Sequence, residues 1–68
     1  MIKVNIKWEE GQRPDKKTGE TELEMPAQII RKEMNIYHEG YCYWCYGFDY
    51  YTDGRGLVLR ASRWKEGE

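Results

Sequence analysis

Residues 41 to 64 read YCYWCYGFDYYTDGRGLVLRASRW, a stretch that predicts a hairpin of two long strands. We place the turn at Asp53-Gly54, because both central residues of a tight hairpin turn adopt positive φ and this dipeptide tolerates that conformation. Tyr50 then faces Leu57, and the register of both strands follows from this pair. A four-residue loop from Asp53 to Gly56 gives the same division of faces, whereas a three-residue loop pairs apolar residues with polar ones.

This register divides the hairpin into two faces. The first suits a core, and its apolar members are Cys42, Trp44, Tyr46, Phe48, Tyr50, Leu57, Leu59 and Ala61. The second is crowded with Tyr, Trp and Arg, which are enriched at the centres of protein interfaces. We therefore predict a partner-binding surface made of Tyr41, Tyr43, Tyr51, Arg55, Arg60 and Trp64. Two alternatives stay open for this face: the N-terminal hairpin folds over it, or a homodimer buries it.

The N-terminal half predicts a second hairpin. Residues 2–8 alternate apolar and polar side chains with a period of two, and Thr21 to Met25 does the same. Both segments are typical of half-buried strands. The polar stretch from Glu9 to Gly19 contains several Gly and Pro breakers and is the predicted loop between them.

A single helix is predicted between the two hairpins. Pro26 suits a first helical turn, where its missing N–H has no partner to lose. The apolar residues that follow fall near helical spacing and make one stripe, formed by Ala27, Ile29, Ile30, Met34 and Tyr37. We expect Asn35 or Gly40 to end this helix.

These elements predict an α+β fold in the order β-β-α-β-β, with an antiparallel sheet that carries the helix on one face. The 68 residues suffice for one domain, 1–68, and are too few for two. A formal net charge of −1 argues against a general binder of phosphate backbones. No apolar run approaches the roughly 20 residues that span a bilayer, and the N-terminus lacks a signal-peptide core. We expect a cytoplasmic protein with reduced thiols and no membrane partner.

Two patterns suggest thiol or metal chemistry. Cys42-Tyr43-Trp44-Cys45 is a Cys-x-x-Cys, but a predicted strand points residues three apart to opposite faces, whereas redox motifs place the first thiol at a helix N-terminus. His38, Cys42 and Cys45 are three potential zinc ligands, although a structural zinc site needs four and no second pair completes it. A zinc-stabilised module through these three residues stays an alternative, and the prediction is no bound metal and no cofactor.

The remaining residues predict no enzyme activity, because no motif positions two titratable groups for acid–base catalysis. The aromatic face favours a non-enzymatic module that binds a protein. The alternative is a single-stranded nucleic-acid binder, with bases stacked on Tyr41, Tyr43 and Trp64 and with Arg55 or Arg60 near phosphate. Four basic residues meet four acidic ones from Tyr41 onward, so this half offers no basic groove and a protein partner is favoured.

In size, charge and aromatic content the chain resembles one class of protein, the phage- or mobile-element-encoded inhibitors that block host defence proteins by occlusion. Anti-CRISPR proteins belong to this class. The resemblance implies an inhibitor that covers a surface of its target. No motif carries it, since it rests on the short length, the near-neutral charge and the crowded aromatic residues alone.

Overall fold

Alternating side chains build the first two strands, as the sequence predicts. In the computed structural model, which describes residues 1–11 and 14–67, β1 spans Ile2–Glu10 and β2 spans Lys17–Met25. The two strands pair antiparallel, with Val4 opposite Leu23, so the predicted N-terminal hairpin is confirmed. Both strands extend into the predicted loop, of which residues 12 and 13 lie outside the described part of the chain.

The predicted helix is wrong. The chain makes one turn of 3-10 helix, η1 (Ala27–Ile29), and then enters a strand, β3 (Met34–His38). Glu33 adopts φ 59°, a left-handed conformation that a continuing α-helix does not accept. The exposure of the residues in β3 alternates with a period of two. The strand is favoured over the predicted helix because β4 (Tyr41–Tyr51) supplies a hydrogen-bonding partner along its whole length.

A two-residue turn at Glu39-Gly40 connects β3 to β4. Both residues have positive φ, 48° and 85°, as a tight hairpin turn requires. Gly40 therefore lies in a β-turn, and the prediction that it ends a helix is wrong.

The predicted register of the C-terminal hairpin is confirmed near its turn and wrong further along. The expected turn conformation is wrong, because Gly54 has φ 104° but Asp53 does not adopt positive φ. Strands β4 and β5 (Gly56–Lys65) pair antiparallel with Tyr50 opposite Leu57, as expected. A β-bulge between Cys45 and Gly47 then shifts the register, so that Cys45, and not Tyr46, faces Ala61. Because side chains alternate with a period of two, this one-residue shift exchanges the faces of every residue of β4 that precedes the bulge.

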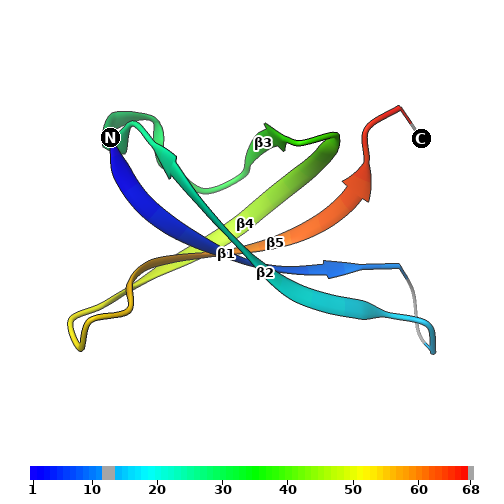
Figure 1. The fold of residues 1–68 in the computed structure, drawn as a ribbon, viewed down its shortest axis with the longest axis horizontal. Helices are drawn as coiled ribbons and strands as arrows, with labels where there is room; N and C mark the ends of the chain where they lie inside the picture. The colour runs from blue at the N-terminus through cyan, green and yellow to red at the C-terminus, as the bar shows by residue number, and fades with distance from the viewer. Residues whose placement is uncertain (12–13, 68) are drawn as a thin grey trace.

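One mixed sheet contains all five strands, in the order β2-β1-β5-β4-β3. Neighbouring strands are antiparallel except β1 and β5, which run parallel with Val4 beside Leu57. Figure 1 shows the sheet strongly twisted, with the β1–β2 hairpin crossing the β4–β5 pair. The predicted α+β class, with a helix packed on one face, is wrong. The described residues hold no α-helix, and none of their helices is long and apolar enough to cross a membrane.

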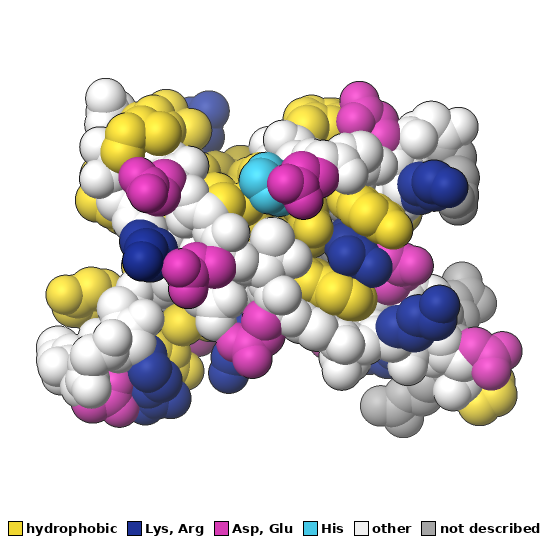
Figure 2. All heavy atoms as spheres, in the orientation of Figure 1, with side chains coloured by type: hydrophobic (Ala, Val, Ile, Leu, Met, Phe, Trp, Pro, Cys, Tyr) yellow, Lys and Arg dark blue, Asp and Glu magenta, His cyan; other side chains and the backbone are white. Residues whose placement is uncertain are grey.

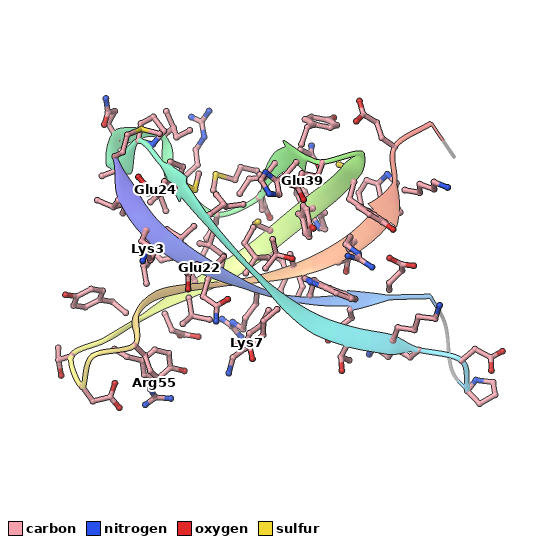
Figure 3. The ribbon with its side chains drawn as sticks, in the orientation of Figure 1. Lys3, Lys7, Glu22, Glu24, Glu39 and Arg55 are labelled. Carbon is pink, nitrogen blue, oxygen red and sulfur yellow. The ribbon has the colours of Figure 1, made fainter. Side chains whose placement is uncertain are left out.

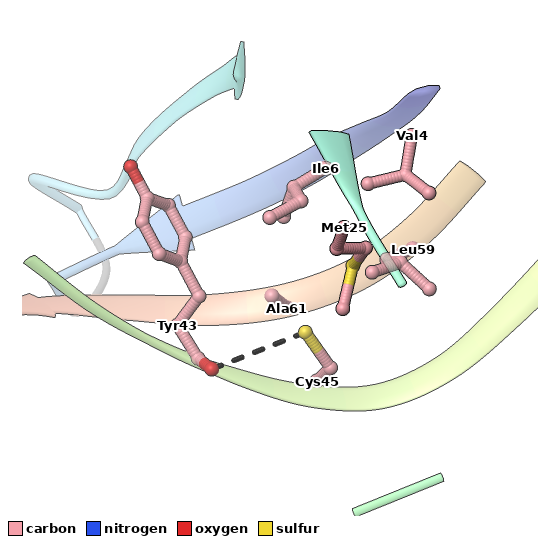
Figure 4. Packing of buried hydrophobic residues seen from close by; sticks show 7 residues of the cluster. All are labelled: Val4, Ile6, Met25, Tyr43, Cys45, Leu59 and Ala61. Atoms are coloured by element: carbon pink, nitrogen blue, oxygen red, sulfur yellow. Dashed lines mark hydrogen bonds between the residues drawn. The ribbon is translucent and has the colours of Figure 1, made fainter. Parts of the chain in front are cut away.

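The twist of the sheet encloses a core that needs no covering helix. The main cluster of buried residues lies on one face of the sheet, which we call the core face (Figure 4), and its members are Val4, Ile6, Met25, Tyr43, Cys45, Leu59 and Ala61. Cys42 and Val58 are also buried, on the opposite face. The Tyr43 hydroxyl lies 3.3 Å from Oγ1 of Thr21, so this ring reaches from β4 to β2 across the core. The indole N–H of Trp8 donates to the same oxygen at 3.0 Å. We call the opposite side of the sheet the outer face.

A stacked arginine joins three strands at one end of the core face. The guanidinium carbon of Arg63 lies 3.5 Å from the ring centre of Trp8 and 4.0 Å from that of Tyr41. Its Nε donates to Oε1 of Glu10 at 2.7 Å, and the Arg63 side chain is only 14% exposed. A planar guanidinium between two rings is attracted to both of them by stacking and cation–π interactions. The ammonium group of a lysine cannot stack in this way.

We expect Arg63→Lys to lower the free energy of unfolding by about 1–2 kcal/mol, because both stacking contacts lose the planar guanidinium. Urea unfolding followed by circular dichroism measures the change. Arg31→Lys, at an exposed position outside the strands, is the matched control and should leave the midpoint unchanged. Equal midpoints for Arg63→Lys and wild type would contradict a structural role for the stack.

Candidate binding surface

Two of the predicted binding residues lie on the core face, because the β-bulge moves them there. Tyr43 is 2% exposed and belongs to the buried core. Tyr41 is half-buried and stacks on Arg63. Their expected place on an exposed face with Trp64 is therefore wrong, because neither ring lies on the outer face.

Tyr51 and Arg55 lie at the tip of the β4–β5 hairpin and bind each other. The Arg55 guanidinium carbon lies 3.7 Å from the Tyr51 ring centre, and its Nη2 donates to Oδ2 of Asp53 at 2.7 Å. This guanidinium lowers the pKa of the Asp53 carboxyl below its ordinary value. The arginine and the ring thus stabilise the turn together, at a distance along β4 from the other predicted residues.

Arg60 and Trp64 do lie on the outer face, as the sequence predicts. Arg60 is exposed, pairs with Asp49 at 3.3 Å and lies 6.0 Å from the ring centre of Tyr46. Trp64 is 40% exposed and lies opposite Cys42. The structure therefore brings together only part of the predicted set, and it adds new neighbours to Trp64.

The new neighbours form a contiguous uncharged surface that we call the outer patch. It consists of two rows of residues that run across β3, β4 and β5, and the residues of each row are direct cross-strand partners. The first row is Tyr37, Cys42 and Trp64, and the second is Asn35, Trp44 and Ser62. Tyr37 is 64% exposed and Trp64 is 40% exposed, whereas Cys42 is buried between them. The thiol of Cys42 points to Oδ1 of Asn35 at 3.6 Å.

The outer patch carries no charge in a chain of which 34% of the residues are charged. Cys42 beside it, and more weakly Glu66, raise the pKa of the Tyr37 phenol above its ordinary value, so this ring is neutral at physiological pH. The next residue along the second row is Glu9 of β1, which forms an ion pair with Lys16. Glu9 therefore marks the charged border of the outer patch on the side of β1.

A shallow hollow of about 440 Å³ lies on the outer face beyond this border. Its lining includes the cations Lys7 and Arg60, which are cross-strand partners, together with Tyr46 and two carboxylates, Glu9 and Glu20. Figure 2 shows the same mixture on the face that it views, where acidic and basic side chains alternate without a continuous basic stripe. The hollow therefore has no marked preference for an anionic chain.

The three potential zinc ligands do not converge. His38 is the partner of Tyr41 and lies on the core face, as does Cys45, whereas Cys42 lies on the outer face. Both cysteines are free thiols, and the strand that carries them points them to opposite sides, as the sequence predicts. Among the described residues no group of three or more His, Cys, Asp and Glu side chains is placed to hold a metal ion.

Sequence reasoning missed Tyr37 and Trp44, and each had a signal. Tyr37 fits the helical stripe, but Met34-Asn35-Ile36 alternates with a period of two and residues 34–38 precede a Glu-Gly turn, which is also typical of a strand. Trp44 was assigned to the core because the register was extended through Gly47 without interruption. An isolated glycine inside a strand pattern is typical of a β-bulge, and a bulge at this point places Trp44 on the outer face.

Burial raises the pKa of the Cys45 thiol to about 11, with a further contribution from Cys42. The raised value keeps this thiol protonated, so its contribution to stability is present below the ordinary thiol pKa and is lost as the pH rises toward 11. We expect iodoacetamide to leave Cys45 unmodified at neutral pH in the folded protein and to modify it rapidly in urea. Mass spectrometry of the labelled peptides measures this, and equal labelling in both states would contradict the burial of the thiol.

Comparison of the chain with models of known protein families, with curated proteins and with solved structures found no match.

Proposed function

We propose that the protein is a non-enzymatic binding module that holds a protein partner on the outer patch. The observation that supports this most strongly is the contiguous uncharged surface around Trp64 and Tyr37. Protein interfaces are depleted of charge at their centres and enriched in Tyr and Trp. Exposed aromatic rings flanked by polar residues are also the usual anchors of binding energy.

The geometry of the patch favours a flat contact rather than a deep pocket. Its rings lie on a sheet whose backbone hydrogen bonds hold β3, β4 and β5 together, so little conformational entropy is lost when a partner docks. Occlusion of a partner's surface is the mode of action that we propose, as in the phage-type inhibitors, including anti-CRISPR proteins, that the chain resembles in size and composition. Two free buried thiols suit the reducing, cytoplasmic setting that we propose with it.

A single-stranded nucleic acid is the weaker candidate for the same surface. Rings such as Tyr37 and Trp64 are able to stack bases, but a nucleic-acid groove also needs cations that follow the phosphates. The patch itself has none, and the nearest cations on the outer face, Lys7 and Arg60, lie among Glu9, Glu20 and Asp49. We expect the tryptophan fluorescence of the protein, to which Trp44 and Trp64 of the outer patch contribute, to be unchanged by oligonucleotides at physiological salt.

The proposal is tested by capturing partners with wild type and with a Tyr37→Ala/Trp64→Ala variant, and then by measuring the affinity of the purified partner for each. We expect the double variant to bind at least roughly tenfold more weakly, because two anchors of about 1 kcal/mol or more are removed. Both rings are substantially exposed, so circular dichroism should show an intact fold.

Tyr50→Ala is the matched control. Its ring is 72% exposed but lies on the core face near the hairpin tip, outside the outer patch. Retained binding by Tyr50→Ala with lost binding by the double variant would support the proposal. Equal binding by all three proteins would overturn it, as would a partner that proves to be nucleic acid.

A further inference from the structure

The two free edges of the sheet differ sharply in charge. Strand β2 carries Glu20, Glu22 and Glu24 on its outer face, and Figure 3 shows the last two beside Lys3 along the β1–β2 hairpin. Charged side chains on an edge strand protect it from pairing with another sheet. Strand β3 has no charged residue except the single histidine, His38, and its outer edge is unpaired among the described residues. It is the edge that lacks this protection.

The ends of β3 carry opposite charges. Arg31, Lys32 and Glu33 precede the strand, all exposed, which leaves this end with a net positive charge. The described structure gives Arg31 and Lys32 no ion pair. Glu39 follows the strand at the turn, and among residues 1–11 and 14–67 its one ion pair is a 3.9 Å contact with His38. An antiparallel copy of the same strand places its basic end beside the acidic end of the first, twice, so β3 is complementary to itself.

A hollow of about 550 Å³ opens where the two edges of the sheet approach each other. It is lined by Glu22, Leu23, Glu24, His38 and Glu39, with Lys3, whose charge is taken up by Glu22 at 3.4 Å. This leaves a negative surface beside the end of β3. The basic residues that would approach it from a second copy are Arg31 and Lys32.

We propose that two copies of this chain associate by antiparallel pairing of their β3 strands, with Asn35 on the two-fold axis. In this register Glu39 of each copy and Arg31 of the other lie at the same end of the strand pair, since both are four positions from Asn35 and just outside Met34–His38. This register also places Met34 opposite Ile36 on the core face, twice. A register centred on Ile36 would instead bring Glu33 of one copy and Glu39 of the other to the same end of the strand pair, where the like charges repel each other.

This dimer does not rest on the proposed protein partner. Pairing of the β3 edges leaves both outer patches on the same side of a continuous sheet, since each patch contains β3 itself. The dimer and the binding of a protein partner are therefore measured in separate experiments. Either proposal can be overturned while the other is supported.

A charge exchange tests the dimer. We expect sedimentation velocity over a dilution series to show a wild-type dimer. Glu39→Lys and Arg31→Glu/Lys32→Glu should each raise the dissociation constant roughly tenfold or more, since each variant creates two repulsive contacts. An equimolar mixture of the two variants should restore association, because both contacts of the mixed dimer are attractive again. Asp15→Lys, an exposed reversal away from β3, is the matched control and should dimerise as wild type does.

The register has a second test that does not depend on charge. Asn35→Cys should form a disulfide-linked dimer on mild oxidation, because directly opposed residues of antiparallel strands lie at a Cα separation that a disulfide accepts. Tyr37→Cys should not, since its symmetry mate lies four positions away along the partner strand. A monomeric wild type at every concentration, or a variant mixture that stays dissociated, would overturn the dimer. Faster crosslinking by Tyr37→Cys would overturn the register.

Discussion

The parallel ladder between β1 and β5 is the contact on which the remaining structure depends. It joins the N-terminal hairpin to the three C-terminal strands and puts Val4 and Ile6 beside Leu57 and Leu59, four residues of the core face. Without it the chain would hold two separate small sheets, neither with enough apolar surface to be stable alone. Because its partners are about fifty residues apart, folding must close a long loop before this burial stabilises the chain.

Side-chain alternation predicted β1 and β2, and the Asp53-Gly54 turn signal predicted the hairpin of β4 and β5, since both signals are local properties of the sequence. The pairing of Tyr50 with Leu57 followed from a turn dipeptide for the same reason. The predicted helix is wrong because the residues at its end, Met34 and Tyr37, fit helical spacing and also fit a strand. The choice between the two is made by pairing with β4, which lies outside this local stretch. Intrinsic preference is here overruled by the backbone hydrogen bonds that the neighbouring strand supplies.

The candidate site was predictable in kind and not in its members. Aromatic residues on one face of the C-terminal hairpin were expected, and Trp64 and Arg60 are there. The bulge between Cys45 and Gly47 replaced Tyr41 and Tyr43 by other residues of the same strand. One inserted residue thus decided which rings hold the core together and which face outward. Such an insertion depends on how Arg60 and its neighbours pack across the sheet, so Gly47 signals it without fixing its place.

The unequal edges of the sheet have a consequence for the size of any assembly. When an edge strand pairs with the same strand of a second copy, that edge is no longer available to a third copy. The assembly then grows beyond a dimer only if the opposite edge of the sheet also pairs with a strand. Here that opposite edge is β2, where Glu20, Glu22 and Glu24 repel another β2. The glutamates thus prevent further copies from adding at the β2 edge. They favour a closed dimer over the open-ended cross-β stacking to which aromatic-rich strands are prone.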